Sequence, residues 1–461
     1  MARIQCISPV DSSVYAERET ADSDTIQQAL NTAVAAQQTW KNTPVAERQA
    51  LCTRAVDAFV ARRDEIAEEL TWQMGRPISQ TPGEVGGFEE RARYMIEIAG
   101  HSLAPIEPAE REGFRRYIKR EPLGVVFVVA PWNFPYLTSV NAIMPALLAG
   151  NAVLLKHSAQ TPLCAERLQQ VFDEAGLPAG VFQHLHLSHA DTERVIRSPQ
   201  IDFVAFTGSV QGGEMVERTA AGRFIGVGLE LGGKDPAYVR ADASPQHAIE
   251  TVTDGAIFNS GQSCCGIERV YVDAAVYDEF VAGVVELVRA YRLGRPDDRD
   301  SNLGPLVKAA AADFARGQVD DAVTAGARAL IDPAGFEADR AGSPYLAPQV
   351  LVDVDHSMRV MTEESFAPII PIMKVSGDDE AIGLMNDSEF GLTAAIFTQD
   401  EDAAISIGDR IDTGTWFMNR CDYLDPALAW TGVKNSGRGC TLSSVGFEHL
   451  TRPKSYHLKR V

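Results

Sequence analysis

The 461-residue chain has few cysteines and few histidines, and neither set has the spacing of a metal site. The seven cysteines are odd in number and irregularly spaced, without a Cys-x-x-Cys pair, which excludes a disulfide framework and a zinc motif. The nine histidines form no His-x-x-x-His or His-Glu-x-x-His pattern, so no metal is expected. These cysteines indicate a reducing, cytoplasmic environment, in which the thiol of a single cysteine can act as a reactive group.

Basic residues are scarce relative to acidic ones. Lys and Arg total 42 against 63 Asp and Glu, which gives a formal net charge of −21. A surface this acidic repels phosphate backbones and anionic lipids, so neither nucleic acid nor a membrane surface is an expected partner. The N-terminus has no basic region followed by an apolar run, so no signal peptide is expected. The length predicts two or more packed domains.

The longest stretch without a charged residue, 123–155, is long enough to raise the question of a membrane span. Three prolines, two asparagines and a glycine interrupt the central part of this stretch. Backbone groups freed by such breaks would have no hydrogen-bond partners in lipid. The stretch is therefore better interpreted as a strand, a turn, a helix and a strand that are buried inside an α/β domain.

The pattern of apolar residues indicates an α/β protein. Residues 24–73 predict two amphipathic helices. The β-branched run 124–130 is typical of a parallel strand covered on both faces, and a helix at 138–149 and a strand at 152–156 follow it. The same strand–helix–strand order recurs at 201–231. Repeated units of this kind form an open, doubly wound parallel sheet, in which ligands bind beyond the carboxyl ends of the strands.

Cys264 and Cys265 lie in a polar, glycine-containing break that follows a predicted helix. Substrate can reach a thiol in such a break, and nearby backbone amides can lower its pKa and make it a nucleophile. The alternative is that both cysteines are small core side chains, which is the commoner role of cysteine. This segment alone leaves both interpretations open.

Asn133 and Glu230 each follow an apolar strand. Asn133 stands between two prolines, where its amide could be fixed as a donor to an oxyanion, although turn formation is the more frequent role of asparagine in loops. Burial at the end of a strand would raise the pKa of Glu230, which suits a general base that acts through water. A structural ion pair is the alternative for Glu230.

Two glycine-containing segments raise the question of phosphate binding. Residues 228–234 have the spacing Gly-x-x-x-x-Gly-Lys, but Asp235 stands where a P-loop needs Ser or Thr for magnesium, so a nucleotide hydrolase is rejected. Residues 206–213 join a strand to a helix, and their small side chains and free amides suit a pyrophosphate. The second segment is not a Gly-x-Gly-x-x-Gly fingerprint, so by itself it is a weak signal.

Taken together, six short motifs resemble the NAD(P)-dependent aldehyde dehydrogenase superfamily over essentially the whole chain. They are PWNFP at 131–135, FTGS at 206–209, ELGGK at 230–234, GQSC at 261–264, EESF at 363–366 and SGRG at 436–439. The resemblance implies a hydrolytic enzyme that oxidises an aldehyde to a carboxylic acid with NAD or NADP, through a cysteine thiohemiacetal and a thioester. The alternative is a coenzyme A-acylating dehydrogenase of the same fold, against which Glu230 argues because only hydrolysis needs an activated water.

The resemblance also implies roles for single residues. Cys264 matches the nucleophile, Asn133 the oxyanion donor and Glu230 the general base of the family. The residues that match its cofactor site are Trp132, Lys156, Gly208, Ser209, Gly213, Glu364 and Phe366. The residues expected to line the substrate pocket are Phe134, Leu137, Phe258, Ser263, Leu424 and Trp430.

The resemblance further implies an architecture. A dinucleotide-binding domain is expected at 1–104 and 123–232, and an α/β catalytic domain at 233–432. A small β oligomerisation arm would combine 105–122 with 433–461. An exposed hairpin next to an unpaired sheet edge favours strand addition between subunits, so a homodimer or homotetramer is expected.

Two properties stay open at this level. Ala159 stands where the family usually has a carboxylate that disfavours a 2′-phosphate, so either NAD or NADP is compatible with the sequence. The aldehyde is equally open. An inward-facing Arg420 would favour a carboxylated aldehyde such as succinate semialdehyde, whereas an inward-facing Asp254, Asp422 or Asp425 would favour an amino- or guanidino-aldehyde.

Overall fold

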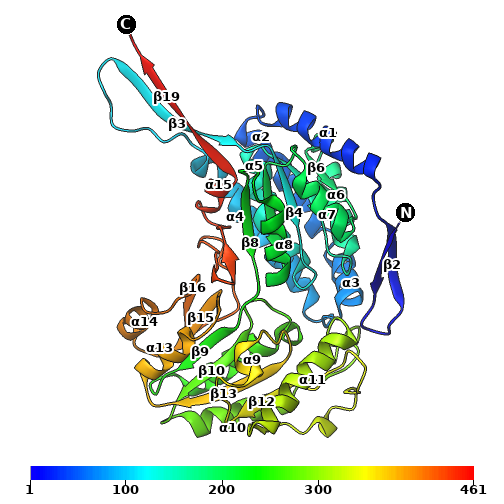
Figure 1. Ribbon diagram of the computed structural model, residues 1–461, viewed down its shortest axis with the longest axis vertical. Helices are drawn as coiled ribbons and strands as arrows, with labels where there is room; N and C mark the ends of the chain where they lie inside the picture. Colours follow the sequence, from blue (N-terminus) through cyan, green and yellow to red (C-terminus); the bar gives the residue numbers. More distant parts are fainter. Residues whose placement is uncertain (1) are drawn as a thin grey trace.

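The computed structural model describes residues 2–461, whose helices and strands gather around two parallel sheets, with a narrow two-stranded arm projecting beyond the upper sheet (Figure 1). The upper sheet has six strands in the order β18-β8-β7-β4-β5-β6, all parallel except β18 at one edge. The strands are β4 (Val125–Val129), β5 (Ala152–Lys156), β6 (Phe182–His184), β7 (Phe203–Thr207), β8 (Gly226–Glu230) and β18 (Gly437–Arg438).

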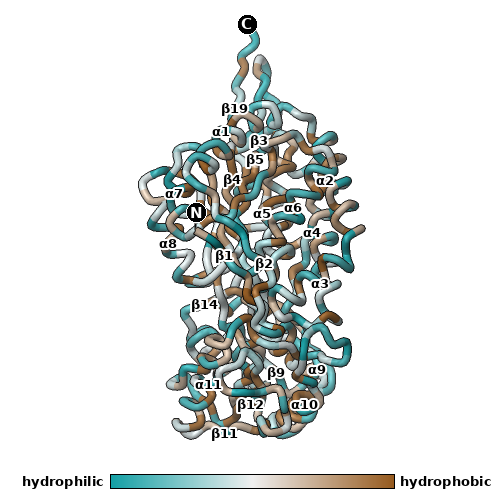
Figure 2. The backbone as a smooth tube through the Cα atoms, turned by 90° about the vertical axis from the view of Figure 1, so that its right-hand side faces the viewer, coloured by the Kyte–Doolittle hydropathy of each residue, from teal (hydrophilic) through white to brown (hydrophobic). Residues whose placement is uncertain are grey.

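Helices cover both faces of this sheet because its central strand is apolar throughout. In β4, Val126 and Val128 face one hydrophobic cluster, and Phe127 faces another on the opposite side. The first cluster contains α2 (Val45–Val60), α3 (Arg63–Met74), α4 (Thr81–Ser102), α5 (Pro135–Ala149) and α6 (Pro162–Glu174). The second contains α1 (Ser23–Trp40), α7 (His189–Arg197) and α8 (Val210–Ala220). Figure 2 shows the hydrophobic backbone around β4 and β5 in the interior of the upper part.

The winding of the chain reverses beside β4. The chain passes from β4 through α5 to β5 and through α6 to β6 on one side, and then returns through α7 to β7 and through α8 to β8 on the other. The expectation of a doubly wound sheet is confirmed. In such sheets the crevice between the two strands at the reversal is where ligands bind, which here is the gap beyond the carboxyl ends of β4 and β7.

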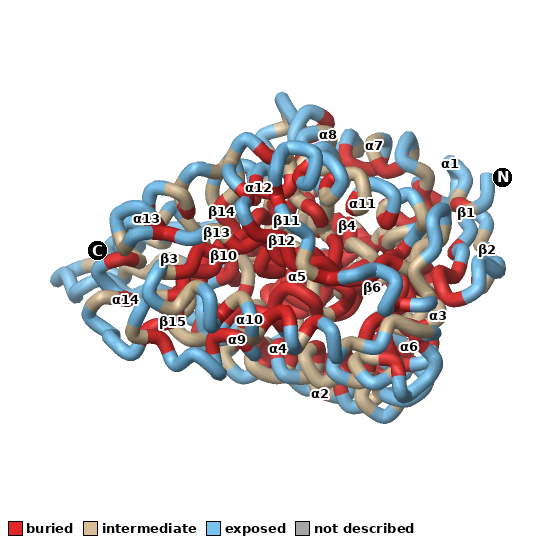
Figure 3. The backbone as a smooth tube through the Cα atoms, turned by 90° about the horizontal axis from the view of Figure 1, so that it is seen from below, coloured by how far each residue is buried: buried red, intermediate tan, exposed pale blue. Residues whose placement is uncertain are grey.

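The lower sheet has seven strands in the order β11-β12-β13-β10-β9-β15-β16, parallel except for β11. The strands are β9 (Asp235–Val239), β10 (Ile267–Asp273), β11 (Arg328–Ala329), β12 (Gln349–Val352), β13 (Ile369–Val375), β15 (Thr393–Phe397) and β16 (Thr415–Met418). One face packs on α9 (Pro245–Ile257) and α10 (Tyr277–Arg289). The other packs on α11 (Ala309–Thr324), α12 (Arg359–Thr362), α13 (Asp378–Asn386) and α14 (Glu401–Gly408). Seen from below, buried residues run along β10, β12 and α5 through the middle of the molecule (Figure 3).

The arm is an antiparallel ribbon of β3 (Phe114–Pro122) and β19 (Thr451–Lys459), paired over the full length of both strands. Tyr117 and Tyr456 stack across it with ring centroids 4.5 Å apart. The smaller elements are the hairpin β1 (Arg3–Ile7) with β2 (Val14–Glu19), the pair β14 (Phe390–Gly391) with β17 (Val433–Lys434), the short helix α15 (Gly446–His449) and two 3-10 turns, η1 (Phe258–Gly261) and η2 (Pro333–Gly335).

The uncharged stretch folds as predicted, into β4, α5 and β5. None of the helices within residues 2–461 is both long and apolar enough to cross a membrane. The two helices expected at 24–73 are in fact three, because the chain breaks between α2 and α3 at Ala61 and Arg62. The apolar pattern continues across this break, so the pattern alone did not reveal it.

Candidate active site

A tight left-handed turn presents Cys264. Asn259, Ser260 and Gly261 have φ of 53°, 57° and 72°, a region that costs energy for residues other than glycine. A Cβ on Gly261 would lie 2.3 Å from the Ala367 carbonyl, so only glycine fits this close approach. The Gln262 side chain fixes the turn, because it donates to the Asn259 carbonyl and accepts from the Val307 amide.

Two cavities meet at this turn. The first, of about 320 Å³, lies between α4, α5, the Cys264 turn and residues 422–430, and is called the helical cavity below. The second, of about 410 Å³, lies beyond the carboxyl ends of β4 and β7 and is called the sheet-edge cavity. Among residues 2–461, Cys264 and Glu230 are the two that line both cavities.

The two neighbouring thiols differ in their surroundings. Cys264 is partly exposed, whereas Cys265 is buried. A hydrogen bond to Cys264, burial and the charge of Asp422 together raise the pKa of Cys265 well above its ordinary value. Cys265 is therefore held as a neutral thiol, which donates to Asp422 at 3.0 Å.

All six residues predicted for the substrate pocket line the helical cavity. Phe134 and Phe258 face each other there, with nearly parallel rings 6.5 Å apart between centroids. The set comprises Phe134, Leu137, Phe258, Ser263, Leu424 and Trp430.

Six of the seven residues predicted for the cofactor line the sheet-edge cavity, namely Trp132, Lys156, Gly208, Ser209, Glu364 and Phe366. Trp132 and Phe366 form an aromatic corner, with ring centroids 5.8 Å apart at an angle of 73°. The seventh, Gly213, lies inside α8, where an added Cβ would collide with Leu231 at 2.7 Å. It borders a separate shallow depression, so its visible role is close packing of α8.

The sheet-edge cavity has features that suit an anionic dinucleotide. Ser209 caps α8 by accepting from the Gly212 amide, which leaves the positive end of the helix dipole at the cavity. Burial lowers the pKa of Lys156, and within residues 2–461 its ammonium group makes neither a hydrogen bond nor an ion pair. A partly desolvated cation without a protein partner suits a ligand that supplies oxygen acceptors.

Close backbone contacts hold Glu364 beside the same cavity. A Cβ on Gly232 would lie 2.4 Å from the Glu364 carboxylate, and the Gly233 amide donates to that carboxylate at 3.2 Å. Burial and the nearby charge of Glu268 raise the pKa of Glu364 to about 8. Glu268 itself pairs with the buried Lys234 at 2.7 Å and accepts from the Phe366 amide, which fixes the segment after Glu364.

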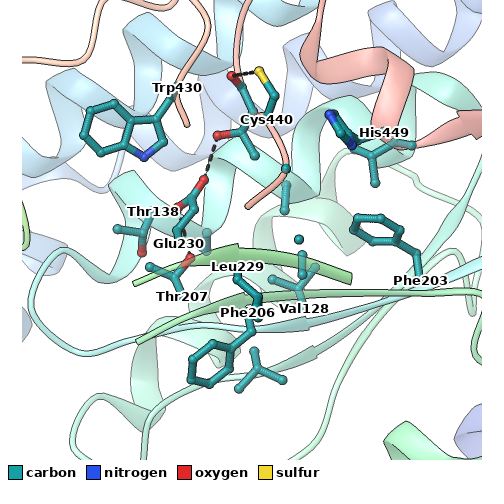
Figure 4. A pocket seen from close by; sticks show the side chains of 18 of the residues that line it. Val128, Thr138, Phe203, Phe206, Thr207, Leu229, Glu230, Trp430, Cys440 and His449 are labelled. Carbon is teal, nitrogen blue, oxygen red and sulfur yellow. Dashed lines mark hydrogen bonds between the residues drawn. The ribbon is translucent and has the colours of Figure 1, made fainter. Parts of the chain in front are cut away.

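Glu230 is anchored by two hydroxyl groups. Thr441 donates to one carboxylate oxygen at 2.6 Å and Thr207 to the other at 3.0 Å. Burial raises the pKa of Glu230, and both hydrogen bonds oppose this rise. Figure 4 shows Glu230 at the edge of a third cavity of about 30 Å³, with Thr207 on one side and Trp430 on another.

Asn133 directs its amide toward the Cys264 turn. Its Nδ2 donates to the Gln262 carbonyl at 3.2 Å and leaves a second N–H on the same nitrogen. Arg76 and Asn259 both donate to the Asn133 carbonyl, so the backbone at this position is held on two sides. Asn133 lines the sheet-edge cavity together with Cys264.

With this geometry in place, the comparison with known proteins is decisive. A model of the aldehyde dehydrogenase family matches residues 1–456. This chain belongs to the aldehyde dehydrogenase family. It is accordingly an NAD(P)-dependent enzyme that oxidises an aldehyde to a carboxylic acid, and the expected fold and family are confirmed.

Similar members of the aldehyde dehydrogenase family differ in the substrate for which they are named. A succinate-semialdehyde dehydrogenase of Deinococcus radiodurans, named for NADP(+), is 35% identical over 90% of this chain and 86% of its own. A 3,6-anhydro-alpha-L-galactose dehydrogenase of Streptomyces coelicolor is 33% identical over 98% and 92%. The crystal structure of a Streptococcus pyogenes succinic semialdehyde dehydrogenase with NADP+ superposes with a TM-score of 0.94, at 28% identity, covering 99% of this chain and all of the other.

Sequence reasoning missed the polar side of α4. Arg76, just before this helix, and Glu84 form a fully buried ion pair at 2.7 Å, and both line the helical cavity. Arg91 lines the same cavity two turns further along the helix. Glu84 and Arg91 are seven residues apart, so they share one helix face. Their place on the same face as the apolar Phe88 and Met95 was the available signal.

Of the four charged residues considered for substrate selection, only Asp422 lines the helical cavity. Arg420 is exposed and lies over the ring of Tyr423 at 3.6 Å, so it does not face substrate. Asp254 and Asp425 border none of the described cavities. Asp422 accepts from Ser263 and Cys265, and burial raises its pKa to about 6.

Proposed function

We propose that Cys264 is the nucleophile, Asn133 the oxyanion donor and Glu230 the general base of this aldehyde dehydrogenase. The observation that supports the proposal is the place of Cys264 and Glu230 at the junction of the two cavities. A residue that forms a covalent bond to the aldehyde and holds it for oxidation must contact both the substrate and the cofactor. Cys264 is in this position, whereas Cys265 borders only the helical cavity.

The thiolate of Cys264 adds to the aldehyde carbon, so that a C–S bond forms and the carbonyl oxygen takes the negative charge. The free N–H of Asn133 and the backbone amide of Cys264 stabilise this oxyanion. When bound in the sheet-edge cavity, the nicotinamide cofactor supplies the hydride acceptor. Lys156, the N-terminus of α8 and Glu364 would hold it there. The acyl group then remains on Cys264 as a thioester.

Glu230 would act in the second half of the reaction. Its ionised carboxylate takes a proton from water, and the resulting hydroxide attacks the thioester and releases the acid and the Cys264 thiolate. The hydrogen bonds from Thr207 and Thr441 favour the ionised form that this step needs. A coenzyme A-acylating enzyme would have no use for such a base, which favours hydrolysis over acyl transfer.

Replacing Glu230 by Gln tests this assignment. The E230Q variant should release about one equivalent of NAD(P)H per active site in a burst and then stall, with the acyl group on Cys264 detectable by mass spectrometry. C264A should give no burst, and C265A should turn over. Steady turnover by E230Q, or acyl-coenzyme A as the product when coenzyme A is added to the unaltered enzyme, would contradict the proposal.

The division into domains is also a proposal. The parallel strands of the upper sheet lie within 1–104 and 123–232, the lower sheet lies within 233–432, and the arm ribbon pairs 105–122 with 433–461. Edge strand β18 belongs to the third segment but pairs with β8 of the first. We propose that the arm mediates a homodimer or homotetramer, because a two-stranded ribbon leaves unpaired strand edges.

The relatives suggest two substrate classes for the aldehyde. The one from Deinococcus radiodurans is named for succinate semialdehyde, which carries a carboxylate, and the one from Streptomyces coelicolor for an uncharged sugar aldehyde. We propose the carboxylated class for this enzyme, and an arginine of the helical cavity, Arg91, which forms no ion pair within residues 2–461, supports this choice.

A further inference from the structure

The helical cavity contains one cation that lacks an acidic partner. Arg91 of α4 has 8% of its surface exposed and makes no salt bridge within residues 2–461. Its hydrogen bonds come from Nη1 alone, to the Leu137 carbonyl at 2.6 Å and to Asn141 Oδ1 at 3.3 Å. Nε and Nη2 therefore have no protein acceptor, although Arg91 lines the cavity.

An unpaired arginine in such a place is unusual. Arginine is rarely this deeply buried unless it is paired, because removal of a charge from water costs several kcal/mol. Burial accordingly lowers the pKa of Arg91. Among the carboxylates that line the cavity, Glu84 pairs with Arg76 and also accepts two backbone amides. Glu90 accepts from the Tyr423 hydroxyl, and Glu230 accepts from two threonine hydroxyls.

Resting on the proposed function, we infer that Arg91 binds the carboxylate of a short carboxylated aldehyde whose carbonyl carbon is attacked by Cys264. The planar guanidinium presents paired N–H donors that match the two oxygens of a carboxylate. Arg91 and Cys264 line the same cavity of about 320 Å³. The aromatic walls, Phe134 and Phe258, would cover the methylene carbons between the two ends of the substrate.

Asp422 is the competing determinant, since it would attract an ammonium group instead. It already accepts from Ser263 and Cys265, and its raised pKa, about 6, leaves part of the population neutral below neutral pH. Arg91 has two donor groups without a protein acceptor and forms no ion pair within residues 2–461, so the carboxylated class is favoured.

The test compares three aldehydes of similar length: 4-oxobutanoate, butanal and 4-aminobutanal. The unaltered enzyme should prefer 4-oxobutanoate to butanal by at least tenfold in kcat/KM. In R91M this preference should be lost, which is a fall of at least tenfold, since a charge-assisted pair is lost. R91K should lie between the two, because lysine keeps the charge and loses the planar fork. R420M, which changes an exposed arginine outside the cavity, is the matched control and should keep the preference.

Binding provides a readout that does not depend on turnover. Succinate carries the carboxylate and has no aldehyde to oxidise, and it should bind the unaltered protein in calorimetry. Its affinity should be at least tenfold lower for R91M and at least threefold lower for R91K. The inference would be overturned if R91M and R91K lost kcat/KM equally for all three aldehydes. It would also be overturned if the two variants bound succinate as tightly as the unaltered protein. A preference of the unaltered enzyme for 4-aminobutanal would assign selection to Asp422. If the protein bound succinate through Arg91 but oxidised no aldehyde, the proposed function would be contradicted while the role of Arg91 in binding a carboxylate would stand.

Discussion

Thr441 donates a hydrogen bond from Oγ1 to Oε1 of Glu230 over 2.6 Å. Thr207 donates to the other carboxylate oxygen, so both oxygens of Glu230 are bound by hydroxyl groups. Burial alone would favour the neutral acid, and these bonds favour the carboxylate. The carboxylate form of the proposed general base is therefore stabilised by a threonine from the C-terminal segment.

Replacing Thr441 by Val removes one of these donors and should raise the pKa of Glu230 further. Glu230 is an active base only above its pKa, so the acidic limb of the kcat profile should move to higher pH. A hydrogen bond to a charged group contributes about 1.5–3 kcal/mol and one pKa unit corresponds to about 1.4 kcal/mol, so the shift should be about one to two units. T138V is the control, because the Thr138 hydroxyl donates to the Phe134 carbonyl instead. An acidic limb that stays in place in T441V would contradict this assignment.

Cofactor choice should respond to the residue at position 159. Ala159 is exposed next to Ser158, which lines the sheet-edge cavity. A carboxylate here would repel a 2′-phosphate, so A159E should lower the ratio of kcat/KM for NADP over NAD by at least tenfold. A159Q has a similar size without the charge and should leave the ratio within about threefold of the unaltered enzyme. Equal ratios in A159E and A159Q would show that the charge at this position does not select the cofactor.

Much of this site could be predicted from the sequence because the relevant residues are close along the chain to strong local signals. Cys264, Asn133 and Glu230 each follow an element that the apolar pattern reveals, and the six motifs relate them to one another. All the residues predicted for substrate and cofactor line one of the two cavities, apart from Gly213, which packs against Leu231.

The residues that escaped prediction depend on long-range packing. Whether a charged side chain of α4 faces a cavity depends on the rotation of this helix about its axis against α5. The amino-acid sequences of the two helices do not determine that rotation by themselves. Arg91 was missed for this reason, and Arg420 was considered because it lies close in sequence to the pocket, although it faces solvent. The Lys234–Glu268 pair is similar, since Lys234 just before β9 meets Glu268 of β10 only after the lower sheet has formed.

Glu364 should make stability depend on pH. Its pKa is about 8 in the folded protein against 4.5 as the ordinary value, so between these values the folded state keeps a proton that the unfolded chain has lost. The contribution of Glu364 to the stability of the folded protein is fully present below pH about 4.5 and is lost as pH rises through about 8. In the absence of cofactor, E364Q should therefore have a higher Tm than the unaltered protein at pH 9, and this difference should vanish near pH 4.5.

E363Q is the matched control for this measurement, because Glu363 is exposed and pairs with Arg359 at the surface. A surface pair of this kind contributes about 1 kcal/mol or less, so E363Q should change Tm little and evenly across the range. A difference between E364Q and the unaltered protein that stays constant from pH 4.5 to 9 would exclude Glu364 as the source of the dependence.

The arm should govern assembly. Leu458 of β19 is 47% exposed, an apolar side chain on the strand of the ribbon whose outer edge has no partner strand within residues 2–461. An apolar residue on a free strand edge favours pairing with a second subunit, and a charge there opposes it. L458D should therefore raise the subunit dissociation constant at least tenfold in analytical ultracentrifugation. I405D changes an exposed apolar residue on α14, far from the arm, and should leave assembly unchanged; the same dissociation in both variants would locate the interface elsewhere.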